Sequence, residues 1–398
     1  MRDVPKKKMN DEDGTNGMDM RPGWMTAGQR GNGSLTVARY RGCLLGGAVG
    51  DALGAAVEFE TLESIRRRLG PHGIRDYESF YGRAGAITDD TQLALFTAEG
   101  LLRARVRGAS TEDAALPAML AAAYQRWLYT QGAPEAVGVA GVPLDGWLLG
   151  HGALRARCAP DFTCVQALTR LPADGLIACN DSKNFGAVTR VAPIGMYVAS
   201  VSEPGDPGLM RRAFELGIAS AAITHGHPTA RLAAGTLAAI VARLLQGAGL
   251  IQAVAASRAE LVRHEGHHEV LRAVDLALEL AREDPAGADT LARLGHGWTA
   301  DEALAVGLYC AVAAESLEEG IVLAVNHSGN SDSTGAITGQ LLGAMHGAHA
   351  IPGRWLDGLE LRDVIREVAD DLAGVAHWPL DEGDLEAAAY WRRKYPGR

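Results

Sequence analysis

Apolar residues recur at spacings of three and four along most of the chain, which is the period of a helix with one buried face. The pattern is clear over residues 93–102, 232–244 and 270–278. These segments are rich in alanine, which favours helix, whereas the alternation typical of strands occurs only in short stretches. Glycine and proline pairs such as Gly70-Pro71 and Pro352-Gly353 mark the joints. The sequence therefore predicts an all-α protein, a compact single domain of many helices over residues 35–398.

The first 34 residues differ from the rest because they are polar and show no periodicity. We expect them to form a disordered tail. Its run of three lysines at 6–8 is not followed by an apolar stretch, so it does not resemble a secretory signal. No uninterrupted apolar stretch of about 18 residues occurs, so no membrane span is expected. The five cysteines are scattered without a C-x-x-C pair, which favours a reducing compartment. These features predict a soluble cytoplasmic protein.

Composition and charge narrow the function classes. The 398 residues are 47% hydrophobic and 22% charged, as in a soluble globular protein, and the formal net charge is −10. An acidic chain is a poor partner for nucleic acid, which is not expected here. A substrate that carries phosphates would have to be held by local donors or bridged by metal.

The first of three notable polar segments spans residues 46–58. Four of its glycines flank Asp51, and Glu58 follows seven residues later. Because seven residues make two helical turns, the two carboxylates are expected on one face of a helix. The alternative interpretation is a closely packed helix with a solvated aspartate.

The second segment, Thr88-Asp89-Asp90-Thr91, directly precedes an apolar helix predicted at 92–102, and the third, 326–335, precedes a small-residue helix at 336–346. Acids in a first helical turn are ordinary caps, which explains one aspartate better than two. Clustered oxygens without cysteine favour Mg²⁺ or Mn²⁺ over zinc. If the two helix starts converge, they could hold one or two metals that orient substrate hydroxyls and activate a water.

In this order the segments resemble the ADP-ribosylglycohydrolase family. Its opening G-x-x-x-G-D-A-x-G-x-x-x-E is matched from Gly46 to Glu58, and its T-D-D-T by residues 88–91. Its late G-D-[ST]-D-[ST]-T-G-A-I-x-G is matched from Gly329 to Gly339 with one exception. Weaker matches lie at 182–193, 224–228 and 297–304. The resemblance covers most of the chain, from about residue 40 to about residue 350.

The resemblance implies a compact all-α fold, a binuclear Mg²⁺ site that could also take Mn²⁺, and hydrolysis of the bond joining ADP-ribose to a protein side chain, often arginine. The metal ligands it implies are Thr88, Asp89, Asp90, Asn330, Asp332 and Ser333. The catalytic residues it implies are Glu58, Asp89, Asp90 and Asp332. Glu58 would lie beside the metals, as a ligand or as a carboxylate that positions or deprotonates water, and Asp51 would support the ligands. The residues implied to contact ADP-ribose and its protein carrier are Glu58, Ser182, Asn184, Phe185, Gly186, His225, Ser328 and Gly329. Backbone N–H groups of glycine-rich loops suit the pyrophosphate.

Two positions depart from the family pattern. Asn330 stands where the family usually has aspartate, and its amide can ligate Mg²⁺ but carries no charge and cannot accept a proton. Loss of that charge is expected to weaken metal binding. Asn184 and Phe185 replace a glycine followed by a small or polar residue. Phe185 could stack on a base or ribose, narrow the pocket, or only pack.

Other interpretations remain at this point. The first is a weakened ADP-ribose reader or an immunity-type protein that neutralises an ADP-ribosyltransferase partner, which Asn330 motivates. The second is an aspartate-rich isoprenoid synthase, which lacks the further acid it needs after Asp89-Asp90. Residues 264–268 fit the H-E-x-x-H pattern of zinc proteases, but Gly266 and charged surroundings favour a solvated helix junction. His225 and His227 could cap the helix after Pro228 instead of contacting a ligand.

Overall fold

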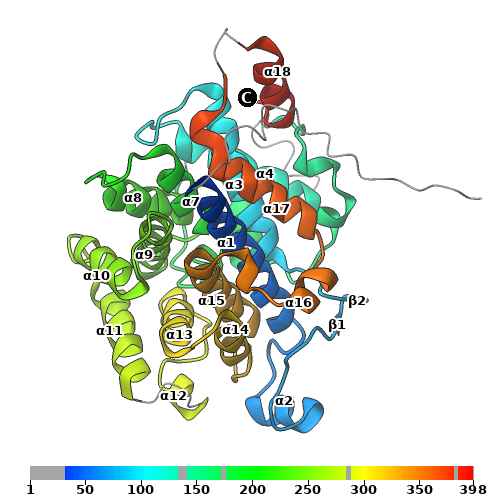
Figure 1. Ribbon diagram of the computed structural model, residues 1–398, viewed down its shortest axis with the longest axis vertical. Coiled ribbons are helices and arrows are strands. Elements are labelled where there is room, and N and C mark those ends of the chain that lie inside the picture. Colours follow the sequence, from blue (N-terminus) through cyan, green and yellow to red (C-terminus); the bar gives the residue numbers. More distant parts are fainter. Residues whose placement is uncertain (1–31, 133–140, 172–175, 284–287, 381–383, 398) are drawn as a thin grey trace, which may run out of the picture.

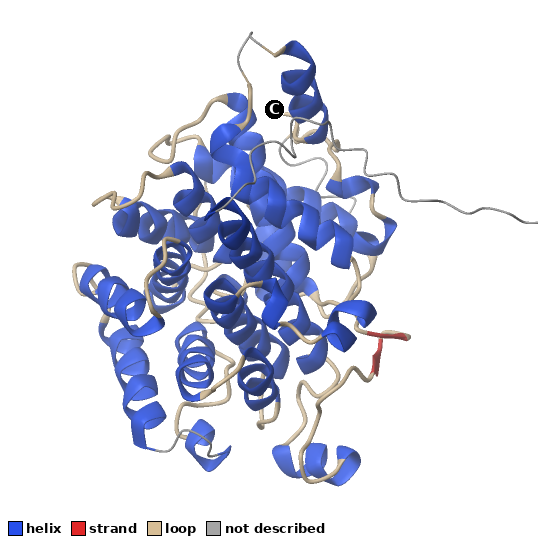
Figure 2. Ribbon diagram, viewed as in Figure 1, coloured by secondary structure: helices blue, strands red, loops and turns tan. Residues whose placement is uncertain are grey.

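The computed structural model describes residues 32–132, 141–171, 176–283, 288–380 and 384–397. Within these ranges the chain is a bundle of helices, and its strands are confined to a short hairpin at one edge (Figures 1 and 2). In that hairpin β1 (Ser79–Phe80) pairs antiparallel with β2 (Arg83–Ala84), with Ser79 opposite Ala84. The prediction of an all-α protein is confirmed.

The helices follow one another with short connections. In chain order the longer ones are α1 (Asn32–Gly54), α2 (Leu62–Leu69), α3 (Asp89–Arg107), α4 (Leu116–Thr130), α6 (Phe162–Thr169), α7 (Ala192–Val201), α8 (Leu209–Ala222), α9 (Pro228–Leu245), α10 (Leu250–Leu261), α11 (His268–Glu283), α13 (Ala300–Ala313), α14 (Leu317–Val325), α15 (Ser331–His346), α17 (Arg362–Gly374) and α18 (Leu385–Lys394). Shorter pieces include α12 (Ala288–Ala292), α16 (Gly353–Gly358) and the 3₁₀ turn η4 (Phe185–Ala187).

Helices α1 and α15 pack with their backbones in direct contact near the centre of the molecule (Figure 1). Glycines on one helix face glycines on the other, and a Cβ atom added at any of them would overlap the partner's carbonyl oxygen. The facing pairs are Gly42 with Gly343, Gly46 with Gly339, and Gly50 with Gly335. The same close approach brings Gly54, at the end of α1, against the first turn of α15. The pairing therefore joins the C-terminus of one helix to the N-terminus of the other.

Helix α9 is a core helix. By length and composition alone it could cross a membrane, the one such helix among the described residues, but 83% of that stretch is buried inside the bundle. A core helix of a soluble protein has the same character. The helix is not an uninterrupted apolar stretch in the sequence, because it contains Arg231 and Arg243.

Two predicted local structures were wrong. Helix α1 ends at Gly54, so Glu58 lies in the turn that follows and does not share a helix face with Asp51. The chain reverses there through Phe59, whose φ is +67°. Helix α15 begins at Ser331 instead of at residue 336, because the glycine pairing admits its first turn beside Gly54. Of the predicted tail, residues 1–31 lie outside the described residues, and residues 32–34 open α1.

The interpretation of residues 264–268 as a helix junction is confirmed. Residues 264–267 lie between α10 and α11, so the two histidines of the H-E-x-x-H pattern do not share a helix. All five cysteines are free and four of them are buried, with Cys179 exposed.

Candidate active site

Three helix ends meet around Asp51, which is fully buried in the last turn of α1. Its carboxylate accepts hydrogen bonds from the backbone N–H groups of Thr88 (3.0 Å) and Thr91 (3.2 Å), and from the Thr91 hydroxyl. Because the first N–H groups of a helix lack partners within it, an aspartate from another helix can satisfy them. Asp51 therefore holds the start of α3 against the end of α1.

The start of α3 also contacts α15 and the loop before α7. Thr88 caps α3, its hydroxyl accepting from the N–H of Asp90 (3.2 Å). The Asp90 carboxylate accepts from the Ser333 hydroxyl at 2.7 Å and from the Thr189 hydroxyl at 2.5 Å. Residues from three distant parts of the chain thus meet at one carboxylate.

The remaining acidic residues of the set lie beside these contacts. The Asp332 carboxylate accepts from the N–H of Ser333 (2.8 Å) in the first turn of α15. The Asp89 carboxylate accepts from the N–H of Asp161 (3.0 Å), the residue that caps α6. Among the described residues, Asp89, Asp332 and Asp90 accept hydrogen bonds only from hydroxyl and backbone groups. No described residue forms an ion pair with any of these three carboxylates.

Burial strongly perturbs the pKa values of the acids, although the charge of Arg190 lowers that of Asp90. Desolvation, with the charge of Asp90, raises the pKa of Asp51 to about 7 and that of Glu58 to about 8. Desolvation raises the pKa of Asp90 to about 6. The same cause raises the pKa values of Asp89 and Asp332 well above their usual range, with neighbouring carboxylates adding to it. Raised carboxyl pKa values in a shared site indicate that positive charge is favoured there.

Several polar atoms around the acids have no hydrogen-bond partner. They are Glu58 Oε2, Asn330 Oδ1 and the Ser331 hydroxyl oxygen, all buried. Unpaired buried oxygens are costly unless something binds them. An oxygen-rich, anionic and partly unpaired set fits a hard divalent cation such as Mg²⁺. In the described part of the chain, one group of three His, Cys or acidic residues has ligand atoms within 4.8 Å of one another, namely Asp161, Cys164 and His225. The side chains of the acidic cluster are more widely spaced than these three.

Asn330 lies in a loop tied to the segment before α13. Its amide nitrogen donates to Gly297 O at 3.1 Å, and its backbone N–H donates to His296 O at 2.8 Å. Its Oδ1 stays unpaired, so the position still offers one ligand oxygen. The two residues before it are used structurally. The Ser328 hydroxyl accepts from the N–H of Leu62 (2.8 Å), and Gly329 approaches His296 so closely that a Cβ would overlap its carbonyl oxygen.

The predicted substrate loop is well ordered by its own polar side chains. The Asn184 side chain accepts from the N–H of Gly186 (2.8 Å), capping η4, and the Ser182 hydroxyl accepts from the N–H of Asn184 (3.2 Å). The N–H of Gly186 is therefore already used within the loop. Phe185 is half-buried, with its ring 6.3 Å from that of Trp298.

Trp298 also stacks on Phe59, at 5.2 Å between ring centroids and 17° between planes. Phe59 is 73% exposed and directly follows Glu58. Phe59, Phe185 and Trp298 therefore form an aromatic surface next to the acidic residues. Trp298 and Phe59 were not among the predicted site residues, although the motif Gly297-Trp298 was noted as a match.

His225 is completely buried, and its Nδ1 lies 2.8 Å from the Thr224 hydroxyl. His227 instead caps α9, its Nδ1 accepting from the N–H of Thr229 (3.1 Å). The capping interpretation is therefore confirmed for His227 but not for His225. Asp161 was missed because it lies 72 residues from Asp89 in a segment with no motif. Only the tertiary fold brings the two together.

Comparisons with known proteins identify the family. The family model of the ADP-ribosylglycohydrolases matches residues 33–380. A Rhodospirillum rubrum protein named ADP-ribosyl-[dinitrogen reductase] glycohydrolase is 27% identical over 339 residues, which cover 83% of this chain and 92% of the relative. An uncharacterised Archaeoglobus fulgidus protein is 29% identical over 347 residues, 84% of this chain and 95% of the relative. A solved structure described as an ADP-ribosylglycohydrolase-related protein complex has a TM-score of 0.61 and 27% identity, covering 86% of this chain and 99% of that one.

The chain therefore belongs to the ADP-ribosylglycohydrolase family. The resemblance seen in the motifs is confirmed, and the helical architecture is that of the family. The chemistry that membership supports is hydrolysis of an ADP-ribose linkage, with an ADP-ribosylated protein as substrate and ADP-ribose as product. The isoprenoid synthase interpretation is set aside.

Proposed function

We propose that this protein is a Mg²⁺-dependent hydrolase that cleaves the glycosidic bond between ADP-ribose and an arginine side chain, reversing the modification of a target protein. The observation that carries the metal part of the proposal is the buried acidic cluster. Its carboxylates come from three helix ends and, among the described residues, accept hydrogen bonds from hydroxyl and backbone groups without forming a salt bridge. The free cysteines support a reducing compartment, the cytoplasm.

Six residues of the cluster are suited to hold two Mg²⁺ ions. They are Thr88, Asp89, Asp90, Asn330, Asp332 and Ser333. When bound, Mg²⁺ would supply positive charge that orients the ribose hydroxyls and polarises the attacking water. Each of these side chains sits in a first helical turn or just before one, so its position is fixed by helix geometry.

The protein itself contributes proton transfer and orientation. Breaking an anomeric C–N bond requires a water directed at the sugar carbon and stabilisation of oxocarbenium-like charge. Glu58 lies in the turn after α1 with Oε2 buried and unpaired, so this oxygen is available to accept a proton from water or to ligate metal. The aromatic surface of Phe59, Phe185 and Trp298 offers flat faces on which the adenine base can stack.

The test is release of free ADP-ribose from an arginine-ADP-ribosylated protein, measured with Mg²⁺ and with a chelator. We expect release only with Mg²⁺, and a loss of at least about 100-fold in Asp90→Asn, by analogy with the size of metal-site perturbations. Asp363→Asn, an exposed aspartate on α17, removes the same charge away from the site and should leave the rate unchanged. Equal release without divalent cations contradicts the metal role. Release from a serine-linked but not an arginine-linked substrate contradicts the arginine specificity.

Asn330 favours one alternative, an ADP-ribose-binding protein that has lost turnover. Such a protein would act by binding its ligand or by neutralising a transferase partner. The amide brings no negative charge to a site that needs it. Binding of ADP-ribose without hydrolysis, in the presence of Mg²⁺, would support that alternative. Recovery of hydrolysis in Asn330→Asp would then locate the defect at this residue.

A further inference from the structure

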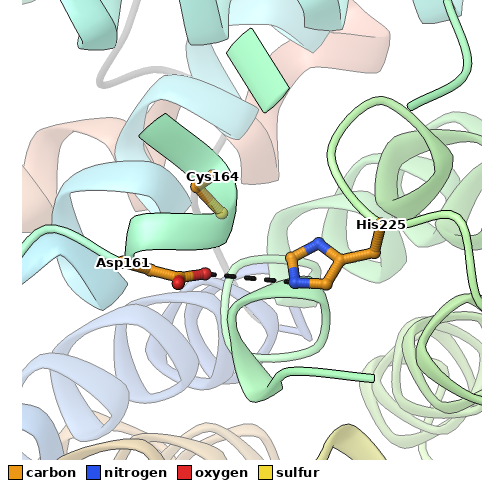
Figure 3. A group of neighbouring side chains, drawn as sticks. All are labelled: Asp161, Cys164 and His225. Carbon is orange, nitrogen blue, oxygen red and sulfur yellow. Dashed lines mark ion pairs between the residues drawn. The ribbon is translucent and has the colours of Figure 1, made fainter. Parts of the chain in front are cut away.

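Asp161, Cys164 and His225 form a second cluster of ligand-type side chains, distinct from the acidic set (Figure 3). One ligand atom from each lies within 4.8 Å of the other two, and all three residues are buried. Asp161 caps α6, Cys164 lies in its first turn, and His225 follows α8. The backbone N–H of Asp161 faces Asp89, whereas its side chain faces His225. The cluster therefore adjoins the acidic site without sharing a side chain with it.

The hydrogen bonds around His225 involve Nδ1 and leave Nε2 without a partner. The Thr224 hydroxyl accepts from Arg190 Nη2 at 2.6 Å and donates to Ala221 O at 3.5 Å. Its 2.8 Å contact with His225 Nδ1 can have the imidazole as donor, which is the tautomer that a metal on Nε2 requires. The neutral ring then has a bare lone pair on Nε2. A histidine whose Nδ1–H donates to a fixed oxygen is the usual arrangement of a metal ligand.

Nε2 of His225 faces the side-chain carboxylate of Asp161. His225 Nε2 lies 3.9 Å from Asp161 Oδ2, and neither atom has a hydrogen-bond partner although both are buried. The separation is too long for a hydrogen bond through a shared proton. In the tautomer with the proton on Nδ1 both atoms are acceptors, and a cation between them would stabilise both. Tetrahedral ligands of zinc lie about 3.3–3.8 Å apart, given metal–ligand bonds of about 2.0–2.3 Å, so a small inward movement would suffice.

We propose that Asp161, Cys164 and His225 bind a single Zn²⁺ ion, with the fourth coordination position open to water. Oxygen, nitrogen and sulfur ligands together select zinc over the hard Mg²⁺. The Cys164 thiol loses its proton to solvent as the Zn–S bond forms. Arg190 Nη1, 3.1 Å from the sulfur, donates a charge-assisted hydrogen bond to the thiolate. Once the thiol has lost its proton, the carboxylate, the thiolate and the Arg190 guanidinium together carry one net negative charge toward the cation.

The bound ion would connect α6 to the end of α8. Because Asp161 also donates its N–H to Asp89, the zinc site would hold one neighbour of the acidic cluster in place. This role is independent of the Mg²⁺ ions proposed above, and zinc binding can be measured without any assay of hydrolysis.

The experiment uses Co²⁺ as a spectroscopic substitute for zinc in the full-length protein after removal of metal with a chelator. One equivalent of Co²⁺ should produce the near-ultraviolet charge-transfer band of a cobalt–thiolate bond, and one equivalent of Zn²⁺ should abolish it. Cys164→Ser should remove the band, and His225→Gln should weaken Co²⁺ binding by at least about 100-fold. Cys310→Ser, at another buried cysteine, and Asp90→Asn, in the acidic cluster, should both keep the band.

Circular dichroism and gel filtration of each variant separate loss of the site from loss of the fold. If Cys164→Ser does not fold, the His225→Gln titration still decides. Absence of a charge-transfer band in the natural protein overturns the proposal, as does a band that persists in Cys164→Ser. A band that survives in His225→Gln with unchanged Co²⁺ affinity also overturns it, because the cobalt would then be held without His225.

Discussion

Replacing Asn330 with aspartate should make the protein less stable without Mg²⁺ and more responsive to it. The Asn330 amide donates to Gly297 O at 3.1 Å in a fully buried position. Aspartate cannot donate that bond, so a carboxylate oxygen would face the carbonyl oxygen. Leaving a buried polar group unsatisfied costs about 1–3 kcal/mol, and a further negative charge near Asp332 adds to the cost. We therefore expect the free energy of unfolding to fall by at least about 1 kcal/mol in metal-free buffer.

Magnesium should reverse that loss. A ligand that binds only the folded state stabilises it by about 2.7 kcal/mol when its concentration is 100 times Kd. A carboxylate is a stronger ligand for Mg²⁺ than an amide, so the variant should reach this regime at lower Mg²⁺ concentration than the natural protein. Urea denaturation at a series of Mg²⁺ concentrations measures both effects, and the two stability curves should converge or cross.

Gln252→Glu is the matched control, because it introduces the same charge at an exposed position in the first turn of α10. Its stability should change by no more than about 0.5 kcal/mol, with the Mg²⁺ response of the natural protein. The reasoning is refuted if Asn330→Asp is as stable as the natural protein without metal. It is also refuted if Mg²⁺ stabilises the variant no more than it stabilises the natural protein.

Three further predictions concern the supports of the site. Gly50→Ala should destabilise the protein by about 1–3 kcal/mol, because the added Cβ would overlap α15. Gly353→Ala is the control, since a Cβ there meets open space and should change the stability little. Equal melting temperatures of the two variants would contradict the glycine pairing. Asp51→Asn should cost about 1–3 kcal/mol because its amide group would face N–H donors, and urea denaturation that shows no loss would refute its capping role. Burial lowers the pKa of His327 from 6.5 to about 4. The unfolded chain then binds more protons between these values, so stability should fall as pH drops through this window, by about 3 kcal/mol in total. His327→Gln should flatten this pH dependence in denaturation measured at pH 7 and pH 4, and an unchanged dependence would contradict it.

The helical fold could be predicted because many of its helices are partly amphipathic. The apolar residues of α3 recur with helical period, although the helix begins at Asp89, with Thr88 as its cap, instead of at the predicted residue 92. The boundaries of α1 and α15 were harder. Both helices are buried on nearly all sides, so their ends are not marked by a change from apolar to polar residues. Backbone contact between glycines decides where they end and begin.

The parts of the site that sequence could not supply depend on long-range contacts. Thr189 reaches Asp90 across 99 positions of the chain, and Asp161 reaches Asp89 across 72. Neither residue has a local pattern that differs from that of an ordinary threonine or helix cap. The aromatic contact between Phe59 and Trp298 is likewise invisible to periodicity, because it joins the turn after α1 to the segment before α13. Motif spacing can identify the ligands of a site but not the neighbours that hold them.

The most direct test of the central claim is to locate the divalent cations. Crystals of the natural protein would be grown with Mn²⁺ in place of Mg²⁺, and anomalous diffraction would be recorded at the manganese edge. We predict two peaks between the starts of α3 and α15, within ligand distance of Asp89, Asp90 and Asp332. Absence of anomalous density between these helix ends at saturating Mn²⁺, or peaks confined to other parts of the protein, would contradict the account.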